Sequence, residues 1–258
     1  MSSGGALWGV GRVWLRYFDV FRKSAPYYLV TTFTEPFLYL LAFGFGVGSL
    51  IGSLEANGAQ VSYRSFVFSG ILGQTVLFQG FYEASYGGFV RMYYQRIFQA
   101  IAVTPITLSE VLWGELAWDA SKATLAAVII AAIGVATGDF PLRAPLAIMP
   151  VAFAASLLFS GMGLAVAARA RTIEQISYPQ YLLVFPMFLF CGVFFPVESL
   201  PGWLQWVAWA LPLTAVNSLM RTLTLGFPFQ PWAIPILAAW LVALVLYSRR
   251  AMVGRLVK

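Results

Sequence analysis

Long apolar segments that carry almost no charge are the feature that most constrains how this chain can fold. Residues 26–51 contain no Lys or Arg and a single acidic residue, Glu35. A helix of about 20 residues, rising 1.5 Å per residue, crosses the roughly 30 Å hydrocarbon core of a bilayer. Only 10% of the 258 residues are charged, whereas soluble globular proteins carry about 25%. The sequence therefore excludes an ordinary soluble domain and predicts a polytopic membrane protein.

The residue types present also exclude several kinds of chemistry. The chain has no histidine, which excludes histidine acid–base catalysis, histidine metal sites and Ser-His-Asp triads. Its single cysteine, Cys191, permits neither an internal disulfide nor a CxxC centre. None of the three lysines follows a glycine, so the chain has no Walker A phosphate loop. We therefore expect no enzyme activity, metal or cofactor in this chain, and any ATP that it needs to be bound by another subunit.

Six segments predict membrane-spanning helices in an all-α fold, at 26–51, 66–88, 108–137, 145–168, 176–196 and 232–248. Together they form a single transmembrane domain over residues 26–250. Within residues 1–25, apolar side chains from Leu7 to Phe21 recur at three- and four-residue spacing, opposite a charged face. This pattern predicts a cytoplasmic amphipathic helix that lies in the membrane interface. Residues 251–258 are expected to form a basic cytoplasmic tail.

The distribution of basic residues predicts the orientation of these spans. Twelve of the sixteen Lys and Arg residues fall on one side of the predicted membrane. Three fall on the other side, namely Arg64, Arg143 and Arg221, and Lys122 lies within a span. Because cytoplasmic loops collect Lys and Arg, both termini are expected to be cytoplasmic. The net charge of +6 is explained in the same way, since no basic segment is long or aromatic enough to indicate a nucleic-acid partner.

Several shorter segments complete the predicted topology. Residues 197–226 contain an apolar run, 203–211, that is too short to cross a bilayer, which favours a re-entrant external hairpin between spans five and six. Residues 52–62 predict a polar loop, and residues 91–103 predict a short amphipathic helix stopped by Pro105. Capping boxes at residues 107–110 and 172–175 predict the starts of the third and fifth spans.

Acidic residues within the spans are candidates for function, because burying a charge in a membrane is unfavourable. Glu35 either serves transport or belongs to a local kink at Pro36. Glu83 either lines a pathway or reaches back to the interface. Glu115, Asp119 and Lys122 share one helical face, where they form a proton relay or Asp119 simply pairs with Lys122. If these carboxylates carry ions, the chain is an ion-coupled secondary transporter, which stays open as the alternative function.

The stretch that follows the fifth span resembles a known family signature. Residues 190–201 read FCGVFFPVESLP, which resembles the motif FxGxFFPxxxLP of ABC type-2 exporter permeases. A short apolar hairpin and the sequence LPLT at 211–214 follow it. Within that family the chain looks most like the nodulation-factor (lipo-oligosaccharide) export branch, the NodJ-type permeases, with supporting stretches at 95–96, 110–115 and 118–123. The resemblance covers essentially the whole chain.

The resemblance implies a transport subunit of the bacterial cytoplasmic (inner) membrane. Such a permease forms a homodimer that associates with membrane lipids and with two copies of a separate ABC ATP-binding subunit, which holds ATP and Mg²⁺. It exports a lipid-linked or amphipathic substrate, such as a lipo-oligosaccharide, a glycolipid or a hydrophobic compound. The family does not name the substrate of this chain.

The resemblance also implies two groups of site residues. The segment 91–105 matches the coupling helix that fits a groove on the ATPase, with Ile97, Phe98 and Ile101 as its apolar ridge. The whole coupling group is Arg91, Gln95, Arg96, Ile97, Phe98, Ile101, Thr104 and Pro105. The residues expected to line the substrate path and gate are Glu35, Tyr39, Phe43, Phe78, Phe81, Tyr82, Phe188, Phe194 and Phe195. Residues 197–213 match the external hairpin.

Overall fold

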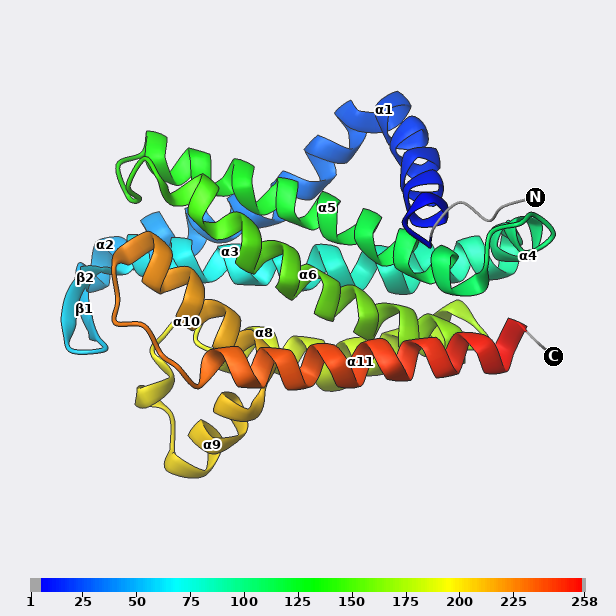
Figure 1. The fold of residues 1–258 in the computed structure, drawn as a ribbon. Helices are drawn as coiled ribbons and strands as arrows, with labels where there is room; N and C mark the ends of the chain where they lie inside the picture. The colour runs from blue at the N-terminus through cyan, green and yellow to red at the C-terminus, as the bar shows by residue number, and fades with distance from the viewer. Residues whose placement is uncertain (1–5, 257–258) are drawn as a thin grey trace.

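The protein is a bundle of long helices with one small two-stranded sheet (Figure 1). The computed structural model describes the backbone of residues 6–256 and the side chains of residues 7–248, except Leu29, Thr31, Gln99 and Ala102. Residues 1–5 of the predicted interfacial helix and residues 257–258 of the predicted tail lie outside the described residues. The described residues are mostly helical, as the predicted all-α class requires.

The predicted interfacial helix and first span are one continuous helical segment. Helix α1 covers Ala6–Tyr39 and continues as a π-helix, Leu40–Val47, and then as α2, Gly48–Ile51. Figure 1 shows that α1 is sharply bent between an amino-terminal limb and the limb that leads to α2. Pro26 lies inside α1, and a proline removes a helical hydrogen bond and favours a kink.

The amino-terminal limb of α1 packs on another helix of the same chain. Val13 and Tyr17 are only 2% and 6% exposed, and they form a buried cluster with Trp118 of α5, Leu108–Ala136. The two helices approach closely at Gly114, where a Cβ atom would meet Val13 at 2.5 Å. Part of the apolar face of α1 that was predicted to face the membrane therefore packs against α5. Leu7, on the same helix, remains 86% exposed.

Residues predicted as a polar loop form a β-hairpin instead. Strands β1, Ser53–Ala56, and β2, Ala59–Ser62, pair antiparallel, with Ser53 opposite Ser62. The connecting Asn57 and Gly58 have φ angles of +49° and +73°. Two consecutive positive φ angles are typical of a type I′ turn, which matches the twist of a two-residue hairpin.

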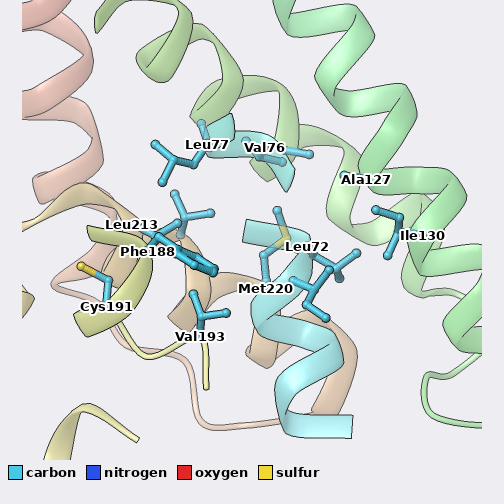
Figure 2. Packing of buried hydrophobic residues seen from close by; sticks show 14 of the residues in the cluster. Leu72, Val76, Leu77, Ala127, Ile130, Phe188, Cys191, Val193, Leu213 and Met220 are labelled. Carbon is cyan, nitrogen blue, oxygen red and sulfur yellow. The ribbon is translucent and has the colours of Figure 1, made fainter. Parts of the chain in front are cut away.

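Helix α3, Tyr63–Tyr82, lies at the centre of the bundle and is buried along most of its length. It packs against α5, α6 (Ala144–Arg169) and α10 (Pro212–Leu225). Figure 2 shows Leu72 and Leu77 of α3 close to residues of the later segments, including Phe188 and Met220. The second predicted span thus forms the core of the fold, and it extends beyond α3 as a π-helical segment over 83–87.

The third and fourth predicted spans agree with helices α5 and α6. The predicted capping box of α5 is confirmed, because Glu110 donates its backbone N–H to Thr107 Oγ1 at 3.3 Å. In return, Glu110 Oε2 accepts the backbone N–H of Thr107 at 2.6 Å. In the polar first half of α5, Glu115 and Asp119 are fully buried where α5 packs against α1 and α3.

The fifth predicted span is broken rather than regular. A 3₁₀ turn, Ile173–Ile176, leads through α7, Ser177–Pro179, and a π-helical turn, Gln180–Val184, to α8, Phe185–Phe190. Proline lacks the N–H that a regular helix needs, and Pro179 and Pro186 both fall in this stretch.

The second predicted capping box is wrong. Thr172 does not cap the following turn with its side chain. Instead, Gln175 Oε1 accepts the backbone N–H of Arg171 at 2.8 Å. A glutamine at this spacing satisfies a free N–H at a 3₁₀ start as well as at an α-helical one, so the sequence pattern alone does not distinguish them.

The last part of the chain forms two short helices and one long helix. A 3₁₀ turn, Val197–Ser199, precedes α9, Gly202–Ala210, which meets α10 at Leu211. Helix α11, Ala233–Leu256, then runs alongside α6 and continues through most of the predicted basic tail (Figure 1).

Among the described residues, three helical stretches are long and apolar enough to cross a membrane. They are Thr32–Ile51, Leu108–Ala136 and Ala144–Arg169, and the apolar part of α11, Ala233–Ser248, is shorter. Helix α3 is not among them, and it carries Gln74, Thr75 and Gln79 in its interior. Neighbouring helices enclose α3, so these polar side chains do not have to face lipid.

Candidate functional site

The segment expected to couple to an ATPase is not a single helix. A π-helical turn, Val90–Tyr94, comes first, and Arg96 then takes a left-handed conformation with φ of +50°. Helix α4 covers only Ile97–Ala102 and is followed by a turn that ends at Pro105. The predicted continuous helix over 91–103 is therefore wrong, because the backbone reverses its helical sense at Arg96.

The predicted apolar ridge of this segment faces the protein itself. Phe98 is 0% exposed and packs in a buried cluster with Phe89 and Leu112. Ile101 also packs against that cluster, and Ile97 is half-buried. The surface that remains for a partner consists of exposed side chains in α4 and on either side of it, which are Tyr94, Gln95, Arg96, Ala100, Val103, Thr104 and Pro105.

Five charged residues from α5 and from the segments between α3 and α4 come together. We call Glu83, Arg91, Glu115, Asp119 and Lys122 the charge cluster. Arg91 Nη1 lies 3.0 Å from a carboxylate oxygen of Glu83, and its Nη2 forms an ion pair with Glu115 and lies 3.7 Å from Asp119. Lys122 Nζ lies 2.7 Å from Glu83, so it does not form the pair with Asp119 that was one of the two alternatives. The Arg91 side chain is only 12% exposed, because most of it is occupied by these pairs within the chain.

Aromatic side chains from both limbs of α1 cover the charge cluster. The ring centroid of Tyr17 lies 5.2 Å from Arg91 Cζ, and the ring of Tyr28 lies 4.2 Å from Lys122 Nζ. Burial and the carboxylate of Glu115 raise the pKa of Tyr17. Burial by itself lowers the pKa of Arg91, but the three carboxylates around it outweigh that effect and hold its pKa well above the usual value. Arg91 therefore stays charged, and its contacts join α1, α5 and the segment that follows α3.

Six of the predicted path residues form a continuous aromatic cluster. The ring centroids of Tyr39 and Phe188 are 5.3 Å apart, and those of Phe78 and Phe188 are 5.2 Å apart. The shortest separation, 4.2 Å, joins Phe43 to Phe194. Tyr82 completes the aromatic cluster, with its ring 5.3 Å from that of Phe78. The structure thus brings together Tyr39, Phe43, Phe78, Tyr82, Phe188 and Phe194.

The other three predicted path residues have different surroundings. Glu35 is exposed and lines a shallow cavity with Leu38 and Tyr39. Phe81 is fully buried in the core of this chain, and its ring makes an edge contact with that of Tyr82 at 5.8 Å between centroids. Phe195 is half-buried at the edge of the same core.

Two residues that the sequence analysis did not assign hold the signature loop. Asn217 Nδ2 donates to the carbonyl of Cys191 at 2.8 Å, and Arg221 Nη2 donates to the carbonyl of Gly192. Gly192 has a φ of +78°, which favours glycine at this position. Asn217 and Arg221 are four residues apart and so share a face of α10. That spacing of polar residues in an apolar segment was a signal that could have identified them.

Comparison with known proteins agrees with the resemblance noted above. The family described as "ABC-2 type transporter" matches residues 10–225. Nodulation protein J from Rhizobium meliloti (strain 1021) is 32% identical over 86% of this chain and 83% of the relative. Nodulation protein J from Rhizobium leguminosarum bv. viciae is 30% identical over 98% of each chain. Inner membrane transport permease YadH from Escherichia coli (strain K12) is 22% identical over 85% of this chain and 84% of the relative. The chain belongs to the ABC-2 type transporter family of membrane permeases.

Proposed function

We propose that this chain is the membrane-spanning permease subunit of an ATP-driven exporter in the bacterial cytoplasmic (inner) membrane. Its cargo is a lipid-linked or amphipathic compound, such as a lipo-oligosaccharide, a glycolipid or a hydrophobic molecule. The observation that carries this proposal is the alignment with nodulation protein J over 98% of both chains. The nine-residue path group reinforces it, because six of its members form one aromatic cluster.

ATP and Mg²⁺ are held by a separate ATP-binding subunit, present in two copies. This chain has no lysine after a glycine and hence no Walker A loop. The exposed side chains around α4 are the proposed docking surface for that subunit, with Gln95, Arg96, Thr104 and Pro105 as its contacts. Phe98 and Arg91 do not contact the partner in this proposal. Their buried side chains hold the docking surface in position against the core.

The proposed topology has six membrane crossings and both termini in the cytoplasm. In Figure 1 both ends of the described chain lie at the same end of the bundle as α4, and the β-hairpin lies at the opposite end. This arrangement agrees with an even number of crossings. The bias of Lys and Arg toward that end supports its cytoplasmic location. Helices α9 and α10 then form the re-entrant hairpin, entered from outside.

The substrate path is proposed to run along the aromatic cluster, between two copies of this chain in a membrane. Tyr39, Phe43 and Glu35 lie on the α1 segment, which contributes exposed apolar side chains such as Phe37 and Leu38. Aromatic side chains combine a large apolar surface with polarisable faces, which suits an amphipathic cargo. Phe195 borders the same region, whereas Phe81 supports it from the core.

The proposal is tested by co-expressing the full-length chain with the ATP-binding subunit encoded beside it and purifying the chain in detergent. We expect the two proteins to elute together in equal numbers, two of each, and ATP hydrolysis to depend on both. A permease that purifies alone, with no change in the hydrolysis rate of the ATP-binding subunit, contradicts the proposal.

A further inference from the structure

A cavity of about 390 Å³ lies between the signature loop and α10. Its walls come from Phe66 of α3, the loop residues Cys191 and Glu198, Trp209 of α9, and Trp232 before α11, together with Arg221 of α10. This cavity is remote in sequence and in position from the charge cluster. Its size is within the range of small-ligand sites, which is roughly 300–1,000 Å³.

Arg221 lines this cavity as a buried cation that forms no ion pair, and Glu198 on the same wall is the acidic side chain that acts on it through space. Its side chain is only 6% exposed, and it takes part in none of the ion pairs among the described residues. One nitrogen, Nη2, donates to the Gly192 carbonyl, and Nε has no hydrogen-bond partner. The guanidinium carbon lies 3.8 Å from the ring centroid of Phe66, so the aromatic face compensates part of its charge.

These contacts leave the guanidinium short of hydrogen-bond acceptors. An arginine side chain carries five N–H donors and stays protonated in proteins. A buried charge without a partner is strongly unfavourable, and the planar fork of arginine fits the oxygens of phosphate and carboxylate groups. An oxyanion in this cavity would supply the acceptors that the protein lacks here.

We propose that the Arg221 cavity binds the phosphate group of an amphipathic molecule. Ser218 of α10 lines the cavity and adds a hydroxyl donor, while Trp209 and Trp232 supply apolar walls for the adjoining chain. Thr214 also lines the cavity, but its hydroxyl already donates to the carbonyl of Ala208. Glu198 at the exposed rim lowers the affinity for anions and thereby permits release. The location of this site at the outer face rests on the topology in the proposed function, whereas the binding itself does not.

The test measures ligand binding to the full-length chain in a neutral detergent, by native mass spectrometry. The probes are a short-chain phosphatidic acid, inorganic phosphate and the matching diacylglycerol, which lacks the phosphate. We expect phosphatidic acid to bind and diacylglycerol to bind at least tenfold more weakly. Binding of inorganic phosphate with equal affinity assigns the site to a free anion, and weaker binding assigns it to a lipid-like headgroup. If neither phosphate-bearing probe binds, the proposal is overturned.

Three variants assign the binding to this cavity. Arg221→Gln is expected to weaken phosphatidic acid binding at least tenfold, and Glu198→Gln to strengthen it severalfold. Arg143→Gln removes an exposed arginine, also on the predicted outer side, and is expected to leave binding unchanged. If Arg221→Gln does not fold, Glu198→Gln decides the question, since an unchanged affinity in that variant contradicts the proposal. Because no ATP-binding subunit is present, failure here is distinct from failure of the exporter assignment.

Discussion

Glu83 and Lys122, 39 residues apart in the chain, form an ion pair of 2.7 Å between the segment that follows α3 and the middle of α5. Glu83 also accepts a hydrogen bond from Arg91 at 3.0 Å. One carboxylate thus holds two cations, and Arg91 in turn reaches Glu115 and Asp119. The charge cluster therefore connects α5 to the two segments that lie between α3 and α4.

Replacing Glu83 with Gln is expected to destabilise the fold. Both cations would lose the carboxylate that they share, and breaking a buried ion pair from one side costs about 3 kcal/mol or more. The measurement is thermal unfolding of the purified chain in detergent, with Glu55→Gln on the exposed part of β1 as the matched control. Equal midpoints for the two variants would contradict a structural role for Glu83.

Substitutions at Phe98 and at Arg96 are expected to affect different properties, namely the stability of the permease and its binding to the ATP-binding subunit. Phe98→Ala leaves a cavity in a fully buried position and should lower the stability of the permease by about 3–5 kcal/mol. Arg96→Asn removes an exposed charge and keeps a residue that tolerates positive φ. It should leave stability unchanged and weaken co-purification of the ATP-binding subunit. Full binding by a folded Arg96→Asn variant would show that this side chain is not a docking contact.

Glu35→Gln separates a transport role from a structural one. Because Glu35 is exposed on this chain, the substitution should not change expression, dimer formation or the unfolding midpoint. Export should fall if the carboxylate contacts cargo or lines the path. The check is export rate per folded dimer, and a loss of folded protein would place Glu35 in the kink at Pro36 instead.

The topology predicts where reporter proteins will be found. A reporter fused after Lys258 or inserted at Arg169 should be cytoplasmic, and one inserted at Asn57 or Asp139 should be outside. Accessibility of single introduced cysteines to a membrane-impermeant reagent, in the Cys191→Ala background, provides an independent readout. Termini on opposite sides of the membrane would rule out six crossings and require residues 203–211 to cross.

Helix boundaries could be predicted from the sequence where a local capping signal and the pattern of buried residues agree. Helix α5 begins at the predicted residue because Thr107 and Glu110 satisfy each other's backbone groups. The β-hairpin was missed although Asn57 and Gly58 are the residues that a type I′ turn favours, because their strands are only four residues long and their alternation is weak.

Other features depend on contacts that the sequence does not specify. An amphipathic pattern around Phe98 predicts a covered face, but not that α5 of the same chain covers it. Likewise, helical spacing placed Asp119 and Lys122 together, whereas the tertiary fold brought Glu83 to Lys122 and Arg91 to Asp119. The left-handed conformation of Arg96 has no local signal, since arginine rarely adopts it.

Measuring transport by the reconstituted proteins is the most direct test of the proposal that this chain is the permease of an ATP-driven exporter. The permease and its ATP-binding subunit would be reconstituted in lipid vesicles with a fluorescent lipo-oligosaccharide, and transport would be measured with ATP and with an imposed proton gradient. We predict transport that requires ATP, Mg²⁺ and both proteins, and that does not respond to the proton gradient alone. Transport by this chain alone, driven by the gradient and abolished in Glu35→Gln, would contradict the account and support an ion-coupled carrier.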